Sequence, residues 1–228
     1  MKIVICTFVF FGFVFSCFAQ DNPRSVLIDA FGYVNCDEML THIDNFALEL
    51  NRISGTKGIA VFYPKNGQPG LALRFRGELS RGIAAKRFGK NPPKLLFGTP
   101  QDETKVEYWV VPPNAKEPEL ALARPDEIFA DVQKPFLYNT EFGGEICPAA
   151  NPQLMADLLR FNQNVDLKMV VRSKSLRYRN RKTRDWLHRL VTIEKIPRRR
   201  IRVVLSTKLE DYFPYQDVEF SFVPKARS

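Results

Sequence analysis

The sequence predicts an α/β (α+β) protein of two tandem units, each with the element order β-α-β-α-β-β, a mixed four-stranded sheet with two helices. The run Val-Glu-aromatic-x-apolar-Val-Pro occurs at 106–112 and again at 218–224, 112 residues apart (218 − 106). Runs of β-branched and aromatic residues that stop at proline are typical of strands. The motif Phe-Gly-x-x-x-Cys also occurs twice, at 31–36 and 142–147. The spacing is that of one small domain, so we expect a duplicated unit.

The first 19 residues have the layout of a secretory signal peptide. Lys2 is followed by an apolar run from Ile3 to Phe15, and the small residues Cys17 and Ala19 occupy the two positions that a signal peptidase reads. We therefore expect cleavage after Ala19 and a periplasmic or secreted mature chain. No stretch reaches the roughly 20 apolar residues of a membrane span, so we expect no transmembrane span in the mature chain. The second possibility is a lipoprotein acylated at Cys17, which the bulky Phe15 disfavours.

The first unit is expected at 20–113. Its helices follow from apolar residues at three- and four-residue spacing, and its strands from short β-branched runs between Gly/Pro-rich loops. In chain order, we expect a strand at 26–28, a helix at 39–50, a strand at 58–63, a helix at 79–88 and strands at 95–97 and 106–111.

The second unit is expected at 135–228 and repeats this series. The proline-rich segment 114–134 is predicted to be a linker with one short helical turn near 128–129. The expected strands of the second unit are at 136–138, 167–171, 201–205 and 218–223, and its helices are at 154–159 and 183–194.

Two cysteines, Cys36 and Cys147, remain after signal cleavage. An even pair in an exported protein favours a disulfide over reactive thiols. Each cysteine lies five residues after the Phe of its Phe-Gly motif. We therefore expect them at equivalent places in the two copies, where a bridge would join the units across a pseudo-twofold axis. The alternative is two buried thiols, one in each unit.

The positive charge belongs to the second unit. Residues 20–150 contain 15 Lys and Arg against 17 Asp and Glu, whereas residues 151–228 contain 18 against 8. Such a field attracts anionic polymers such as acidic glycan, lipopolysaccharide or nucleic acid. Tyr178 and Trp186 lie within the basic run and could stack on bases or sugars. The alternative is a merely solvated basic face with Trp186 in the core. The residues predicted to bind an anionic ligand are Arg172, Lys174, Arg177, Arg179, Arg181, Lys182, Arg184, Arg198, Arg199 and Arg200.

The segment 44–50 (Asp-Asn-Phe-Ala-Leu-Glu-Leu), the strand at 59–63 and the end strand at 106–112 resemble exported bacterial relatives of the C-terminal domain family of outer-membrane protein A (OmpA). The resemblance implies an OmpA-like scaffold in the cell envelope. Peptidoglycan-binding members carry an Asp just after the central strand and an Arg in the following helix. Here Pro64-Lys65 and Arg172-Ser173 follow the two central strands, and Ile83 stands where the Arg belongs. Peptidoglycan is therefore a doubtful partner.

These observations favour an exported envelope module that binds or interacts without catalytic activity or cofactor. The first alternative is a binder of anionic polymers through the basic second unit, and the second, disfavoured alternative is a hydrolase. Cys36 and His42 could form a thiol–base pair, but they lie six residues apart across a helix start and need not meet. The sequence has no His/Cys/Asp cluster at metal-ligand spacing and no Gly-x-Ser-x-Gly motif.

Overall fold

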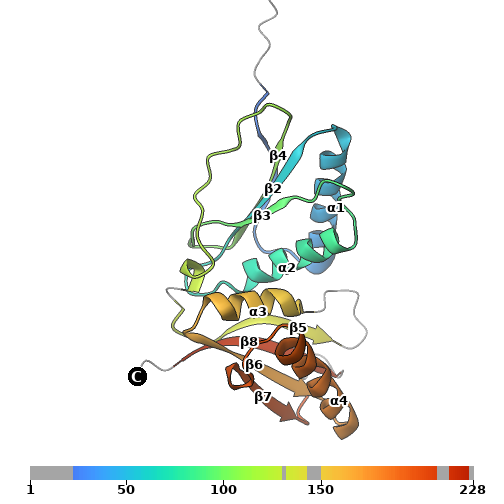
Figure 1. The fold of residues 1–228 in the computed structure, drawn as a ribbon, viewed down its shortest axis with the longest axis vertical. Coiled ribbons are helices and arrows are strands. Elements are labelled where there is room, and N and C mark those ends of the chain that lie inside the picture. Colours follow the sequence, from blue (N-terminus) through green and yellow to red (C-terminus); the bar gives the residue numbers. More distant parts are fainter. Residues whose placement is uncertain (1–22, 130–131, 143–149, 210–215, 226–228) are drawn as a thin grey trace, which may run out of the picture.

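The computed structural model describes residues 23–129, 132–142, 150–209 and 216–225, and it confirms the α+β class and the two similar units (Figure 1). The first unit contains β1 (Val26–Phe31), α1 (Cys36–Arg52), β2 (Lys57–Tyr63), α2 (Gly70–Ala84), β3 (Lys94–Phe97) and β4 (Lys105–Val111). The second unit contains β5 (Phe136–Phe142), α3 (Pro152–Phe161), β6 (Val165–Arg172), α4 (Leu176–Leu187), β7 (Ile201–Ser206) and β8 (Asp217–Pro224). Three short turns complete the fold: 3₁₀ turns at Glu127–Phe129 and Arg198–Arg200, and a π-helical turn at His188–Ile193.

The two sheets have the same strand order, β1-β4-β2-β3 and β5-β8-β6-β7. The repeated Val-Glu strands are β4 and β8, which each pair antiparallel with both neighbours, while β2–β3 and β6–β7 are parallel. Both first strands carry an irregularity at the same place, between Leu27 and Asp29 in β1 and between Leu137 and Asn139 in β5. The similarity of the two units therefore extends to strand register, so strand positions in the two sheets can be matched residue by residue.

The first helix of each unit begins at an asparagine cap. The Asn35 side chain accepts a hydrogen bond from the Glu38 amide at 3.0 Å, and the Glu38 carboxylate accepts one from the Asn35 amide, which completes a capping box. Asn151 caps α3 with a single bond, which its side chain accepts from the Leu154 amide at 3.0 Å. Cys36 follows its cap, whereas Cys147 precedes Asn151 in the sequence. Cys147 lies outside the described residues, so the prediction that the two cysteines hold equivalent positions stays a prediction.

The second helix of each unit begins earlier than predicted. α2 begins at Gly70 rather than at 79. The sequence pattern missed this start because Gly70, Gly77 and Gly82 interrupt the apolar positions, which the structure buries on more than one side of the helix. α4 begins at Leu176 rather than at 183, and Ser175 caps it by accepting a hydrogen bond from the Tyr178 amide. Trp186 is the buried residue of this helix, so its sequence gave little amphipathic signal.

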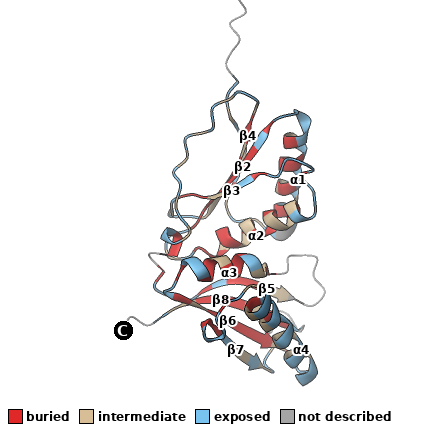
Figure 2. Cartoon of the chain, in the orientation of Figure 1, coloured by how far each residue is buried: buried red, intermediate tan, exposed pale blue. Residues whose placement is uncertain are grey.

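The two units share one hydrophobic core. Buried side chains of both units form one continuous cluster, and α2 lies between the two sheets, in contact with β2 and β5. Figure 2 shows the buried positions continuing from the first sheet through α2 and α3 to the second. A Cβ atom on Gly70 would lie 2.1 Å from the carbonyl oxygen of Leu137, so glycine is required where α2 meets β5.

The segment 114–134 joins the units but is not a free spacer. Ala115 and Leu120 pack against a small cluster on the face of the first sheet that the helices do not cover. Two backbone hydrogen bonds of 2.9 Å, from Thr99 to the Ala121 carbonyl and from Ala123 to the Phe97 carbonyl, tie the segment to the end of β3. The predicted helical turn near 128–129 is confirmed at Glu127–Phe129. Within the described residues, no helix is long and apolar enough to cross a membrane.

Candidate functional site

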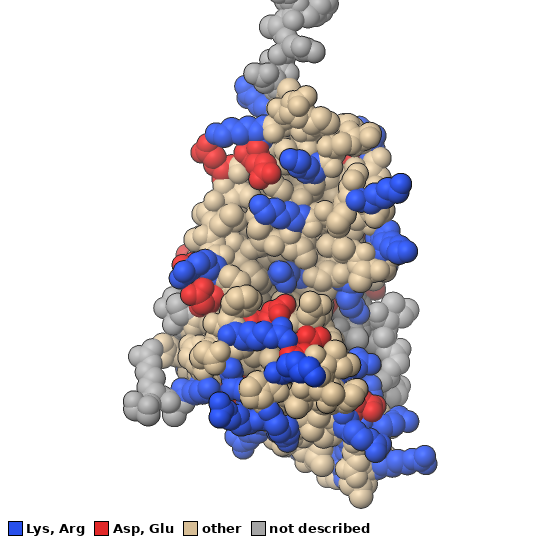
Figure 3. Space-filling view, viewed as in Figure 1, with Lys and Arg blue, Asp and Glu red and all other residues tan. Residues whose placement is uncertain are grey.

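The exposed side of α4 carries a row of cations. Arg177, Arg181 and Arg184 recur at three- and four-residue spacing, so they lie on one side of the helix, and all three are exposed. None of them forms an ion pair with a residue that the structure describes. Lys174 is also exposed, just before the helix. Figure 3 shows Lys and Arg side chains gathered over the second unit. We call Lys174, Arg177, Arg181 and Arg184 the α4 basic row.

Other cations of the predicted set are held by the fold itself. Arg172 bonds to both Asp217 and Glu219 across the outer face of the second sheet, and its side chain is only 14% exposed. Arg200 is buried and bonds to Asp166, Gln163 and three backbone carbonyls. These two arginines are structural, and the prediction that they bind a ligand is not supported by their positions.

Three further predicted cations have partners but remain closer to the surface. Arg179 donates to the Ser173 carbonyl, Lys182 lies 3.4 Å from Glu141, and Arg198 donates to the Ile201 carbonyl. Arg198 and its neighbour Arg199 are exposed at the turn before β7. The structure thus divides the predicted set into an open row on α4, a second exposed pair at 198–199, and cations that brace the fold.

The aromatic residues of the basic run are not open stacking platforms. Trp186 is 2% exposed, packs edge-on against Phe220 and donates its indole N–H to Glu141 at 2.9 Å. Tyr178 is half-buried, and the guanidinium of Arg181 lies 5.9 Å from its ring centroid. Trp186 therefore belongs to the core, as in the alternative interpretation of the sequence.

A groove of about 550 Å³ runs beside the α4 basic row. The π-helical turn widens the helix here, through a hydrogen bond of 2.9 Å from the Glu194 amide to the Arg189 carbonyl. Such turns are frequent at functional sites. No sequence pattern predicted this turn. The groove is lined by Asn180, Thr183, Arg184, Leu187, His188, Val191, Thr192 and Arg198. It combines two exposed arginines with hydrogen-bonding groups and an aliphatic surface.

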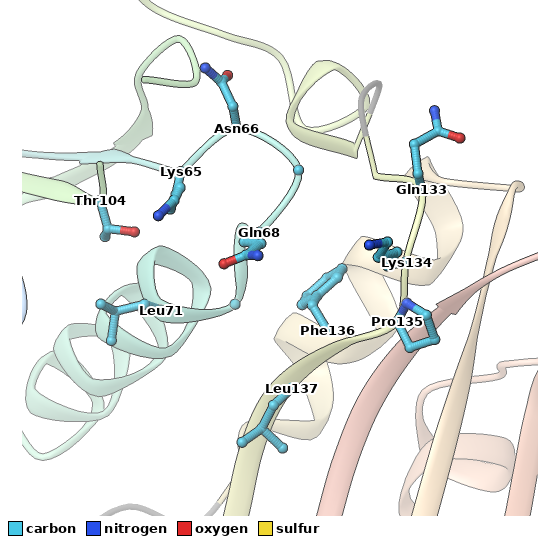
Figure 4. A pocket seen from close by; sticks show the side chains of 12 residues that line it. Lys65, Asn66, Gln68, Leu71, Thr104, Gln133, Lys134, Pro135, Phe136 and Leu137 are labelled. Carbon is cyan, nitrogen blue, oxygen red and sulfur yellow. The ribbon is translucent and has the colours of Figure 1, made fainter. Parts of the chain in front are cut away.

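A second pocket, of about 590 Å³, lies between the two units (Figure 4). One wall is the β2–α2 loop and the start of α2, 65–71, with Thr104, and the other is the end of the joining segment and the start of β5, 133–137. Lys65 and Lys134 come from opposite walls, the Lys65 side chain is directed toward Thr104, and the side chains of Asn66 and Gln133 point away. Sequence analysis missed this pocket, because its walls lie far apart in the chain.

A histidine–aspartate pair lies at the edge of the first unit. Nδ1 of His42 is 2.6 Å from Asp29, and the imidazole stacks on Phe31 with ring centroids 3.9 Å apart. A carboxylate and the histidine that it orients are two of the three members of a catalytic triad. In the part of the chain that the structure describes, no hydroxyl or thiol is bonded to the other ring nitrogen. The side chain of Cys36 lies outside the described atoms, so the thiol–base pair stays a prediction.

The signal peptide, Cys147 and the Cys36 side chain lie outside what the structure describes, so cleavage and the disulfide also stay predictions. Among the described residues, no group of three or more His, Cys, Asp or Glu side chains is arranged to hold a metal ion. Comparison with protein-family models, curated proteins and solved structures gave no match for the chain.

Proposed function

We propose that this protein is a non-catalytic binding module of the bacterial cell envelope and that its second unit binds an anionic polymer. The observation that carries the proposal is the α4 basic row, a set of exposed cations without carboxylate partners among the described residues. Among the residues that the structure describes, no carboxylate forms a salt bridge with this row, so its positive potential is directed at solvent. Such a surface concentrates polyanions and speeds their association.

The surroundings of the row favour an acidic glycan over single-stranded nucleic acid. Binding of single strands relies on aromatic side chains that stack on bases, and Trp186 is buried here. The groove beside the row offers instead the aliphatic side chains of Leu187 and Val191, with Asn180 and Thr192 at hand for sugar hydroxyls. The signal-peptide layout of residues 1–19 supports an envelope location, where acidic glycans occur and genomic nucleic acid does not.

The OmpA-like resemblance supports the scaffold part of this proposal. The strand order of both units accommodates it, but the Asp and Arg that hold peptidoglycan in that family are absent from this sequence. A shared scaffold does not imply a shared ligand, because one fold can carry different binding sites. A contact with a second envelope protein is the other form that this function could take.

The test is charge reversal on the row, Arg177→Glu/Arg181→Glu/Arg184→Glu, with binding to heparin, polygalacturonate and single-stranded DNA measured as salt is raised. The matched control reverses three exposed lysines of the first unit, Lys57→Glu/Lys90→Glu/Lys94→Glu. We expect the α4 variant to lose glycan binding and the salt dependence that goes with it. The control should bind like the wild type, and both variants should melt near the wild-type temperature, because exposed charges contribute little to stability.

Equal loss in both variants would mean that net charge alone attracts the polymer. Unchanged binding in the α4 variant would contradict the proposal. Tighter binding to single-stranded DNA than to either glycan would assign the row to nucleic acid instead.

A further inference from the structure

The pocket between the units is rigidly framed on one side. The loop after β2 is fixed by backbone hydrogen bonds from Asn66 to the Gln101 carbonyl (2.8 Å), from Gln101 to the Pro64 carbonyl (2.9 Å) and from Gln68 to the Lys65 carbonyl (3.0 Å). Gly67 has φ +68°, a left-handed conformation that suits glycine at this tight turn. A loop held in this way fixes the backbone at Lys65 before any ligand arrives, which lowers the entropic cost of ordering the loop on binding.

The charge of the pocket is positive. Lys65 and Lys134 are both exposed, come from different walls, and form no ion pair with any described residue. No lining residue is acidic. Asp102 and Glu103 line a neighbouring hollow, which shares Asn66 and Thr104 with this pocket. An anion bound in the pocket would be attracted by both ammonium groups.

The pocket also has an apolar surface. Leu71, Phe136 and Leu137 contribute to its lining, and the Leu137 side chain is 54% exposed. Pockets of about 300–1,000 Å³ at domain interfaces, apolar with a few convergent polar groups, are typical of small-ligand sites. The volume of about 590 Å³ falls within that range.

We propose that this pocket binds a small amphipathic anion, with its carboxylate or phosphate group between Lys65 and Lys134 and its apolar part over Leu71 and Leu137. This is a different site from the α4 basic row. One wall, the loop after β2, is where the resemblance would place the peptidoglycan site, but that loop carries Pro64-Lys65 and no Asp. The other wall, 133–137, comes from the joining segment and β5 and has no place in a single unit. The ligand would contact both units at once and would stabilise their packing by mass action.

The experiment measures binding of four probes to the full mature chain by calorimetry and by thermal shift. Octanoate and octyl phosphate carry the expected chemistry with two different head groups, octylammonium has the same tail with the opposite charge, and inorganic phosphate has the charge without the tail. We expect one or both of the first two to bind, and the ammonium probe to show no binding. Inorganic phosphate should bind at least about tenfold more weakly than the better alkyl probe, which corresponds to roughly 1.4 kcal/mol.

Two variants locate the site. Lys65→Gln/Lys134→Gln should weaken the better probe at least about tenfold, and Leu137→Asp should weaken it through the apolar part. The matched control, Lys57→Gln/Lys94→Gln, removes the same charge from exposed positions of the first unit outside the pocket and should leave the affinity unchanged. The proposal is overturned if neither alkyl anion binds at millimolar concentration, if octylammonium binds equally well, or if the Lys65/Lys134 variant binds like the wild type.

Discussion

Arg172 stands in the second unit where Tyr63 stands in the first. Tyr63 ends β2 and donates a hydrogen bond to Glu107 at 3.1 Å, and Arg172 ends β6 and bonds to Glu219 and Asp217. Glu107 and Glu219 are the glutamates of the repeated Val-Glu motif. The equivalent glutamate therefore accepts a hydrogen bond from a phenol in the first unit and from a guanidinium in the second. In both units this contact lies on the face of the sheet that the helices do not cover.

Replacement of Arg172 by Met should destabilise the protein by about 3 kcal/mol, because it leaves two nearly buried carboxylates facing each other without their cation. Urea denaturation of the variant measures this loss. Lys168→Met, on the same face and without an ion pair among the described residues, should cost less than about 1 kcal/mol. The double variant Arg172→Met/Glu219→Gln should recover part of the loss, and no recovery would show that the charge pair is not its cause.

The phenol of Tyr63 should ionise at a higher pH than an ordinary tyrosine. Burial, the negative charge of Glu107 and the hydrogen bond to that carboxylate raise the pKa of Tyr63 to about 12. Because the protonated phenol is favoured in the folded state, its contribution to stability is complete below pH 10 and is lost as the pH rises to about 12. The tyrosinate absorbance of the wild type minus that of Tyr63→Phe gives the midpoint. A midpoint near the ordinary value of 10.0 would contradict the contact with Glu107.

Gly70→Ala should destabilise the packing between the units. The new Cβ would meet the Leu137 carbonyl oxygen at 2.1 Å, and this neighbour is backbone that cannot move aside cheaply. We expect a net loss of about 1–3 kcal/mol, despite the better helix propensity of alanine. Gly77→Ala on the same helix is the control, because its nearest neighbour is the Tyr138 hydroxyl at 3.3 Å. Equal melting temperatures for the two variants would show that α2 and β5 can separate without cost.

Stability should depend on pH through Glu78. This carboxylate on α2 is 7% exposed, and burial raises its pKa even though Arg81 and Arg74 pull it back. A raised pKa favours the protonated form in the folded state, so the contribution of Glu78 to stability falls as pH rises from its ordinary value of 4.5. Denaturant midpoints from pH 4.5 to 8 should fall less for Glu78→Gln than for the wild type. Each unit of pKa shift is worth about 1.4 kcal/mol, so the difference is measurable.

Glu119→Gln serves as the control for this pH dependence. The Glu119 side chain is 88% exposed on the segment that joins the units. Its denaturation curve should follow the wild type at every pH. If the Glu78→Gln curve does the same, Glu78 does not titrate differently in the folded protein.

The repeat in the sequence was enough to predict the element order, because strands such as 106–111 carry their signal locally. It was not enough to predict where α2 begins, since Ala72, Leu73 and Phe75 pack inside an environment that includes the second unit. The pocket at Lys65 and Lys134 could not be predicted for the same reason, since its two walls come from different units. The charged run was visible in the sequence, but only packing distinguishes Arg200, bonded inside the fold, from Arg181 on the open side of α4.

The shared core has a consequence for how the protein folds. Although the two units repeat one fold, neither can bury α2 completely without the other, because this helix contacts α1 and β2 in the first unit and β5 in the second. Separation of the halves would return the buried side chains of that contact to water, at about 25 cal/mol for each Å² of apolar surface. The cooperative unit is therefore the pair and not the repeat, so heating should produce one transition for the whole chain rather than one for each copy.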